Sequence, residues 1–347
     1  MNFERPDLTD VDPEVLAYIE ALEMELLQAQ AEKQAQTTVE EKPLESSEPP
    51  TTMNVISISR NGFAKRTPRH FYSRQRRSGM GVFDLETAEG DLPALLVVAD
   101  EEAAILIFTN FGRAFRMKVD VLSEAPVRAR GQNIKTLFTF RPHERIIAAL
   151  PADGGKVAAL ASQRGWVRTV DASRLGSSLI PGMSFYDVQQ GGQMTAVCWT
   201  SGNDDLFMVT RQGKAIRFAE RQVHKSGSLG LRVDMGDEVV AITAVTEESG
   251  VFLLSNDGKG TIRDMSGFRL NKAPGAGGKV AMKTDKLVGA VTVQAEDDLF
   301  MISELGKLIR FNAEEVPVKE GVVQGVNCMS LRNDEVTAVC RAVLNED

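Results

Sequence analysis

Two stretches of the chain are near copies of each other: DDLFMVTRQGKAIRF at residues 204–218 and DDLFMISELGKLIRF at residues 297–311. Each contains an apolar run, a short turn with a glycine, and a second run that ends in arginine and phenylalanine. Glycine reaches the positive φ angles of tight turns without steric cost, so this pattern predicts a β-hairpin.

Looser copies of the hairpin recur along the rest of the chain. They are VISISRNGFAKR (55–66), AILIFTNFGRAFR (104–116), KVAALASQRGWVR (156–168) and GVFLLSNDGKGTIR (250–263). The turn glycines of the whole set are 45–53 residues apart, a period typical of propeller blades. They are Gly62, Gly112, Gly165, Gly213, Gly258 and Gly306.

An uninterrupted apolar run follows each hairpin, as in LPALLVVAD (92–100) and VVAITAVTE (239–247). Such runs are typical of a strand that is buried on both faces. A weaker glycine repeat marks a further strand, at Gly81, Gly182, Gly230, Gly278 and Gly325. Four strands in each of six repeats predict an all-β, six-bladed propeller-like disc over residues 54–347.

The first 53 residues differ from the disc in charge, with 13 Asp and Glu against 3 Lys and Arg. Within residues 1–36, the stretch 13–36 predicts an amphipathic helix with an apolar seam at Val15, Ile19, Leu22, Leu26 and Ala29. The helix is either a lone helix that rests on the disc or a helix for dimerisation or a partner. Residues 37–53, rich in Glu, Pro, Ser and Thr, predict a disordered linker.

Composition favours a soluble globular protein, with 43% hydrophobic and 25% charged residues. No apolar run approaches the length of a membrane span, and the N-terminus does not resemble a secretory signal. Cys198, Cys328 and Cys340 lack metal-ligand spacing, as do the three histidines, so we expect no metal or other cofactor and a cytoplasmic location.

A basic, flexible stretch opens the disc: SRQRRSGMG at residues 73–81. Residues 54–83 hold seven Lys and Arg and no Asp or Glu, although the chain as a whole carries a formal charge of −8. This local excess of positive charge predicts a polyanionic ligand.

Together, the repeats and this basic stretch resemble the C-terminal domain of DNA gyrase A and of its topoisomerase IV counterpart, over residues 54–347. In that family a six-bladed β-pinwheel, whose blades exchange strands, bends DNA around a basic rim. QRRSGMG at 75–81 resembles the family's heptapeptide Gln-Arg-Arg-Gly-Gly-(Arg or Lys)-Gly, which we call the box. The sequence differs from this heptapeptide at two positions: Ser78 stands where the family has a glycine, and Met80 stands where it has a basic residue.

The resemblance, together with the basic residues that recur in phase, predicts a DNA-binding rim that follows phosphates rather than bases. The candidate DNA-binding residues are Lys65, Arg66, Arg69, Arg74, Gln75, Arg76, Arg77, Gly79, Gly81, Arg113, Arg116, Lys118, Arg128, Arg130, Arg168, Lys214, Arg217, Lys259, Arg263, Lys307 and Arg310. Asp204, Asp205, Asp297 and Asp298 precede repeat strands and are expected to be solvated rather than metal ligands.

The chain by itself is not expected to be an enzyme, because neither the family's cleavage domain nor a phosphate loop is recognisable in it. The leading function is sequence-nonspecific binding and bending of double-stranded DNA, either as a nucleoid-associated architectural protein or as an accessory to a type II topoisomerase. One alternative is a protein-interaction propeller that has lost DNA binding. Another is the DNA-wrapping piece of a split topoisomerase, joined to the enzyme's core through the N-terminal helix. Self-association through that helix is also open. The acidic leading segment is expected to compete with DNA for the basic rim.

Overall fold

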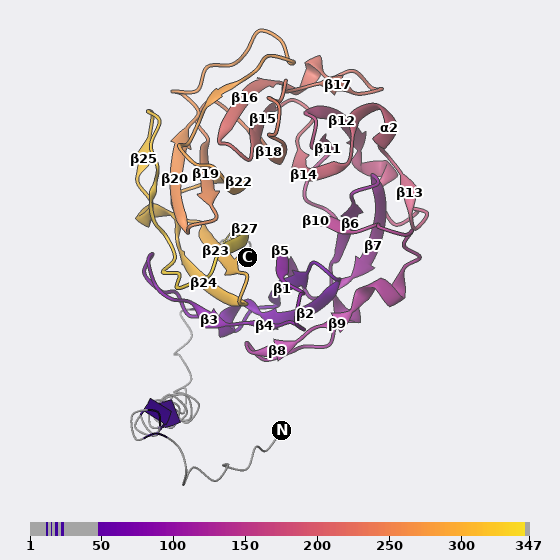
Figure 1. Cartoon of the computed structure of the whole chain (residues 1–347). Coiled ribbons are helices and arrows are strands. Elements are labelled where there is room, and N and C mark those ends of the chain that lie inside the picture. Colours follow the sequence, from indigo (N-terminus) through magenta and orange to yellow (C-terminus); the bar gives the residue numbers. More distant parts are fainter. Residues whose placement is uncertain (1–11, 13–14, 16–17, 20–21, 24–47, 344–347) are drawn as a thin grey trace. The chain divides into compact units, whose positions relative to one another are not determined.

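A computed structural model describes residues 12, 15, 18–19, 22–23 and 48–343 of the chain. Residues 48–343 form a ring of β-sheets around a central opening (Figure 1). No helix among the described residues is long and apolar enough to cross a membrane.

All six predicted hairpins are present, and we number the blades 1 to 6 after them. Their turn glycines have φ between +71° and +84°, as the sequence pattern requires. The hairpins are β1 (Met53–Ser59) with β2 (Phe63–Pro68), β6 (Ala104–Thr109) with β7 (Arg113–Lys118), β11 (Val157–Ser162) with β12 (Trp166–Asp171), β15 (Asp205–Thr210) with β16 (Lys214–Ala219), β19 (Gly250–Ser255) with β20 (Lys259–Asp264), and β23 (Asp298–Ser303) with β24 (Lys307–Asn312).

The uninterrupted apolar runs form the innermost strand of each blade, as predicted, and surround the central opening (Figure 1). These strands are β5 (Pro93–Asp100), β10 (Ile146–Pro151), β14 (Met194–Thr200), β18 (Val239–Val245), β22 (Leu287–Val293) and β27 (Val336–Ala342).

The outermost strand of each blade comes from the segment that follows the hairpin of the next blade. Blade 1, for example, has the order β5-β1-β2-β9, and β9 (Gln132–Asn133) lies after the hairpin of blade 2. The other outer strands are β13 (Met183–Ser184), β17 (Ser228–Leu229), β21 (Lys279–Val280), β25 (Val318–Lys319) with β26 (Val326–Asn327), and β3 (Val82–Phe83). The exchange of strands that the resemblance implies is therefore present all around the ring.

Strand β3 closes the ring, because it follows the hairpin of blade 1 but pairs with β24 of blade 6. In that pairing Phe83 lies opposite Lys307, and Val82 lies opposite Leu308. A short parallel pair, β4 (Leu85–Glu86) with β8 (Ala129–Arg130), lies beside this junction.

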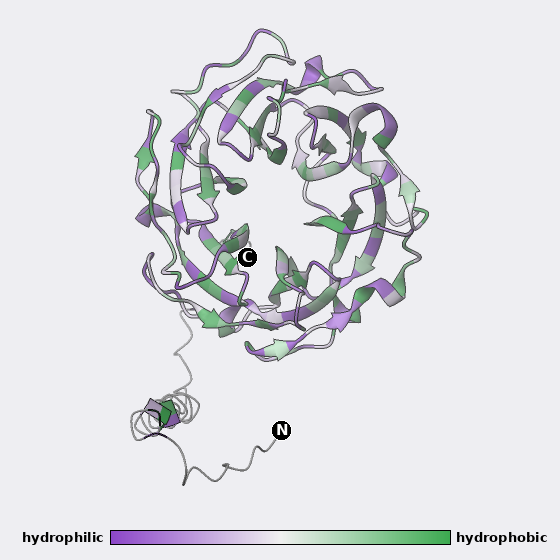
Figure 2. Ribbon diagram, viewed as in Figure 1, coloured by the Kyte–Doolittle hydropathy of each residue, from purple (hydrophilic) through white to green (hydrophobic). Residues whose placement is uncertain are grey.

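The hydrophobic core is divided among the junctions between blades. Each of six clusters of buried apolar side chains joins two neighbouring blades, and Figure 2 shows the apolar residues concentrated along the strands. The cluster at the closing junction, for example, packs Phe300 and Leu308 of blade 6 against Val55 and Leu96 of blade 1. Burial of such side chains stabilises the ring by about 1.5–3 kcal/mol each.

The predicted linker is ordered at its end. Strand β1 begins at Met53, and the backbone N–H of Thr51 donates to Nδ1 of His70 at 3.2 Å. The predicted disorder over 37–53 therefore does not extend to residues 48–53, and 37–47 lie outside the described residues. Of the predicted helix 13–36, residues 15, 18–19 and 22–23 are described, and they are helical.

Candidate nucleic-acid interface

The box lies on the closing junction of the ring, between η1 (Arg69–Phe71) and β3. The backbone N–H of Gln75 donates to the carbonyl of Arg310 at 2.8 Å, and the N–H of Ser78 donates to the carbonyl of Cys328 at 2.9 Å. The N–H of Gly81 donates to Oε1 of Gln75 at 3.2 Å, which folds the loop onto itself. The backbone of the box is therefore fixed on blade 6, and its side chains decide what it can bind.

Two positions of the box need the left-handed region of φ. Gly81 has φ +72°, and a Cβ there would lie 2.7 Å from the carbonyl oxygen of Leu308. Ser78 has φ +70°, a conformation rare for side chains other than glycine. The family's box has glycine at this position. Ser78 adopts this positive φ here, and its hydroxyl donates a hydrogen bond to the carbonyl of Asn327 at 2.7 Å.

The cations of the box differ in their freedom to meet a ligand. Arg76 is exposed, and no described residue forms an ion pair with it. Arg77 is half-buried, with Nη1 donating to the carbonyl of Asn327 at 3.2 Å. Nε of Arg74 donates to Oδ2 of Asp298 at 3.0 Å, and its side chain is partly exposed. Arg76 is thus the box side chain best placed for a phosphate.

Many of the predicted DNA-binding residues are not on an exposed rim, which corrects the sequence-based expectation. Seven are buried inside or between the blades: Lys65, Arg66, Arg69, Arg113, Arg217, Arg263 and Arg310. A buried cation must be paired, and these are paired or hydrogen-bonded within the protein. Nζ of Lys65, for example, lies 2.7 Å from Oδ1 of Asp84, and Nη1 of Arg113 lies 2.5 Å from Oε2 of Glu144. Burial lowers the pKa of Lys65, and the charge of Asp84 opposes that shift.

The recurrent arginine four residues after the turn glycine joins neighbouring blades in three cases. Nε of Arg66 donates to the carbonyl of Leu122 in the blade 2 segment at 3.0 Å. Nη1 of Arg217 in blade 4 donates to the carbonyl of Met265 in the blade 5 segment at 2.7 Å. Nη1 of Arg310 in blade 6 donates to the carbonyl of Tyr72 in the blade 1 segment at 3.0 Å. The periodicity of these arginines therefore reflects assembly of the ring.

The aspartates of the near-identical copies explain how two of these arginines are buried. Nε of Arg217 donates to Oδ2 of Asp205 at 2.9 Å, and Nε of Arg310 donates to Oδ2 of Asp298 at 2.6 Å. The expectation that these aspartates are solvated is wrong for Asp297 and Asp298, which are buried. Among the described residues, no group of three or more His, Cys, Asp and Glu could hold a metal ion.

The remaining predicted cations lie at or near the surface. Lys118 is exposed at the end of β7, and Arg128 and Arg130 are exposed on the segment that follows the blade 2 hairpin. Lys214 and Lys259 are half-buried and pair with Asp234 and Asp257. Arg116, Arg168 and Lys307 are also half-buried, and so are Gln75, Gly79 and Gly81.

Sequence reasoning missed the exposed cations that occupy positions analogous to the box in later repeats. They lie in the segments after the hairpins of blades 4 and 5, which form the outer edges of blades 3 and 4. They are Arg221, Lys225, Arg232, Arg269, Lys272 and Lys279. In the sequence, basic residues in the segment after each hairpin indicate exposed cations better than basic residues at the end of the hairpin's second strand do.

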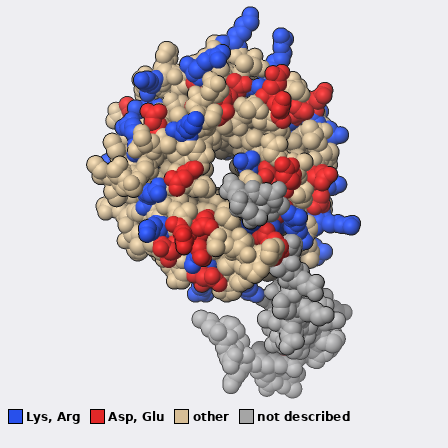
Figure 3. All heavy atoms as spheres, turned by 180° about the vertical axis from the view of Figure 1, so that it is seen from behind, with Lys and Arg blue, Asp and Glu red and all other residues tan. Residues whose placement is uncertain are grey.

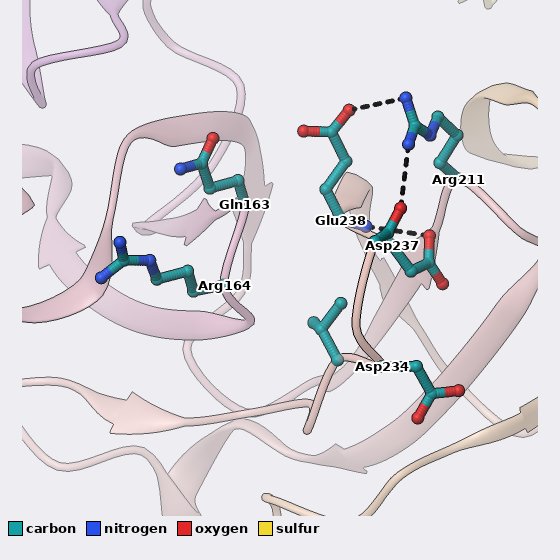
Figure 4. Close-up of a pocket in the computed structure, with 8 residues that line it drawn as sticks. Gln163, Arg164, Arg211, Asp234, Asp237 and Glu238 are labelled. Atoms are coloured by element: carbon teal, nitrogen blue, oxygen red, sulfur yellow. Dashed lines mark hydrogen bonds and ion pairs between the residues drawn. The ribbon is translucent and has the colours of Figure 1, made fainter.

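Acidic residues are interspersed with the cations on the face shown in Figure 3, so the basic surface of that face is not a continuous band. A pocket of about 450 Å³ between the turns of blades 3 and 4 also has mixed charge (Figure 4). Glu238 and the carbonyl of Gly236 engage Arg211 at 3.5 and 3.0 Å, and Asp234 and Asp237 add further negative charge to its lining. This pocket is therefore a poor site for a phosphate.

Comparison with known proteins agrees with the fold and the repeats. The family model described as "DNA gyrase C-terminal domain, beta-propeller" matches residues 54–92, 103–153, 204–246 and 297–339. These are the four repeats in which an arginine stands four residues after the turn glycine.

Curated relatives include the gyrase A protein of Ureaplasma parvum, 29% identical over 295 residues that cover 81% of this chain and 35% of that protein. The gyrase A protein of Escherichia coli is 29% identical over 294 residues, covering 81% of this chain and 33% of that protein. The chain spans about a third of the length of the curated relatives it matches.

Among solved structures, a DNA gyrase A C-terminal domain superposes with a TM-score of 0.70 at 19% identity, covering 84% of this chain and 100% of that one. The C-terminal domain of a DNA topoisomerase IV superposes with a TM-score of 0.59 at 17% identity, covering 83% of this chain and 93% of that one. The repeats, the strand exchange and the family match together show that this chain belongs to the DNA gyrase C-terminal domain family.

Proposed function

We propose that the disc binds double-stranded DNA without sequence preference and bends it along its outer edge. The observation that carries this proposal is the placement of exposed cations on the exchanged segments, where each segment covers the edge of the preceding blade. Such cations can track phosphates without reading bases.

The exposed cations group into two arcs. Arg74 and Arg76 lie on the edge of blade 6, and Arg128 and Arg130 lie on the edge of blade 1. The second arc holds the cations on the edges of blades 3 and 4 described above. Contacts along an arc would offset the cost of bending, which is of order 1–6 kcal/mol for 20–30 base pairs bent by 40–90°.

The edges between the arcs are poor in positive charge. Residues 175–193, which include the outer strand of blade 2, contain no Lys or Arg. Residues 313–330, which cover blade 5, contain three glutamates and one lysine. We therefore expect DNA to be bent over part of the ring rather than wrapped around all of it.

The family also associates this disc with type II topoisomerases, so we propose that the chain acts as an architectural protein or as an accessory to such an enzyme. Co-purification with a topoisomerase core would support the accessory role. The proposed location at the nucleoid follows from DNA binding.

A protein partner is the second candidate, and the edge of blade 2, which lacks Lys and Arg, favours it. Ile180 there is 68% exposed, next to the exposed Met183. An apolar partner surface would cover these side chains, whereas DNA would not.

Bending is tested with a duplex of about 30 base pairs that carries a fluorescent donor and acceptor at its two ends. Saturating protein should raise the efficiency of energy transfer, because bending brings the ends together. Binding with unchanged transfer would contradict bending, and absence of binding at low salt would contradict DNA binding itself.

A further inference from the structure

A carboxylate from the acidic leading segment lies between two buried arginines of the disc. Oε1 of Glu48 accepts from Nε of Arg69 at 3.0 Å, and Oε2 accepts from Nη2 of Arg310 at 2.8 Å. The side chain of Glu48 is 12% exposed, and both arginines are buried. One carboxylate thus bridges blade 6 and the segment that leads into the box.

The equivalent arginine of blade 4 does not use such an outside carboxylate. Nε and Nη2 of Arg217 lie 2.9 and 2.8 Å from Oδ2 of its own Asp205. At the closing junction, Oδ2 of Asp298 accepts from both Arg310 and Arg74. Nη2 of Arg310 is directed to Glu48 instead.

The closing junction therefore carries an excess of positive charge within the disc. Asp298, a buried carboxylate of the repeat, pairs with both Arg74 and Arg310, and the adjacent Arg69 pairs with Glu48. Since buried cations require an anionic partner, the disc here has the character of an anion site.

We propose that Arg69 and Arg310 form an oxyanion site that takes a phosphate group, and that Glu48 occupies it as an intramolecular mimic of that group. Guanidinium N–H donors match the oxygens of a phosphate as they match those of a carboxylate. The phosphate is either free or part of a nucleic-acid backbone, and only the nucleic-acid source rests on the proposed function.

Two further features agree with this assignment. Burial alone would raise the pKa of Glu48, but its hydrogen bonds to Arg310 and Arg69 outweigh burial and hold the pKa below its ordinary value. Asp298 links Arg310 to Arg74, so the occupant of the site contacts the same charged network as the box.

The site is tested by thermal unfolding of the full chain in inorganic phosphate and in chloride at equal ionic strength. Glu48→Ala should lower the midpoint in chloride, and phosphate should restore it by about 3 °C or more beyond its effect on the wild type, since a ligand stabilises the state that binds it. The exposed Glu102 serves as the matched control, and Glu102→Ala should respond as the wild type does.

Equal phosphate responses in wild type, Glu48→Ala and Glu102→Ala would overturn the proposal. The gain should also disappear in Glu48→Ala/Arg69→Ala. If Glu48→Ala does not fold, Glu48→Gln provides the test, because its uncharged amide keeps the shape of the side chain. Titration calorimetry of Glu48→Gln at low temperature should then detect phosphate binding that the wild type lacks, and no heat of binding would overturn the proposal.

Measuring the affinity for duplex DNA distinguishes the two sources of phosphate. Glu48→Ala should bind a short duplex about threefold or more tightly at fixed salt if the site takes a backbone phosphate. A response to inorganic phosphate with unchanged duplex affinity assigns the site to free phosphate. Failure of every variant to bind DNA would contradict the proposed function without affecting the phosphate result.

Discussion

Nη1 of Arg310 lies 3.0 Å from the carbonyl oxygen of Tyr72, although 238 residues separate them in the sequence. This hydrogen bond joins the hairpin of the last blade to the segment that leaves the first hairpin. The box follows directly, so closure of the ring and presentation of the box depend on the same arginine.

Replacement of Arg310 should therefore destabilise the ring. Arg310→Met leaves Asp298, Glu48 and the carbonyl of Tyr72 without this partner, and breaking a buried pair costs about 3–5 kcal/mol. Urea unfolding measures the loss. Lys307→Met in the same strand, at a half-buried site, is the control and should cost under about 1 kcal/mol. A similar loss in both variants would contradict the special role of Arg310.

Alanine substitutions at two glycines should distinguish the free-energy cost of a left-handed backbone from that of a steric clash. Gly90 has φ +79° with no atom within 4 Å of an added Cβ, whereas at Gly81 that Cβ would lie 2.7 Å from the carbonyl of Leu308. Gly90→Ala should cost about 1 kcal/mol for its left-handed conformation. Gly81→Ala should cost about 1–3 kcal/mol more because of the clash. Equal unfolding free energies would contradict the close approach of the box to blade 6.

The three cysteines should be poorly reactive in the folded protein. Burial raises the pKa of Cys328 and of Cys340 to about 12, and it raises the pKa of Cys198 as well. Because the thiolate is the reactive form, a thiol reagent at pH 8 should label the native chain slowly and all three cysteines rapidly in denaturant. Fast labelling of a native cysteine would contradict this.

The contribution of Glu48 to stability should depend on pH. Its pKa is lowered in the folded state, below an ordinary value of 4.5. Its stabilising effect is therefore fully present above that ordinary value and is lost as pH falls through the folded pKa. The difference in unfolding free energy between wild type and Glu48→Gln should be largest near neutral pH and should shrink towards pH 3. A difference independent of pH would show that the charge of Glu48 does not matter.

Sequence patterns predicted the hairpins and the inner strands because glycine turns and apolar runs are local signals. The outer strands were harder to predict, since β3 and β9 have only two residues each and pair with a different blade. Strand exchange is a property of the ring, and no single repeat reveals it.

The same limitation explains the error about the basic residues. Arginines at equivalent positions of the repeats indicate a shared environment. Their spacing alone does not show whether that environment is an exposed rim or a buried junction between blades. Asp205 with Arg217 and Asp298 with Arg310 are each 12 residues apart in the two copies, and that repeated spacing was the available signal for burial. Arg76 has no such partner in the sequence, and it is exposed.

Exposed cations on the exchanged segments should account for the affinity of the disc for DNA. The most direct measurement is the affinity for a short duplex across a salt series, for the wild type and two double variants. Arg76→Ala/Arg130→Ala removes exposed charges from the edges of blades 6 and 1, and Lys156→Ala/Arg341→Ala removes two exposed charges from outside the exchanged segments. We expect the first variant to bind more weakly, with a salt slope reduced by about 1–2, and the second to follow the wild type. Equal slopes and affinities in all three proteins would contradict the claim.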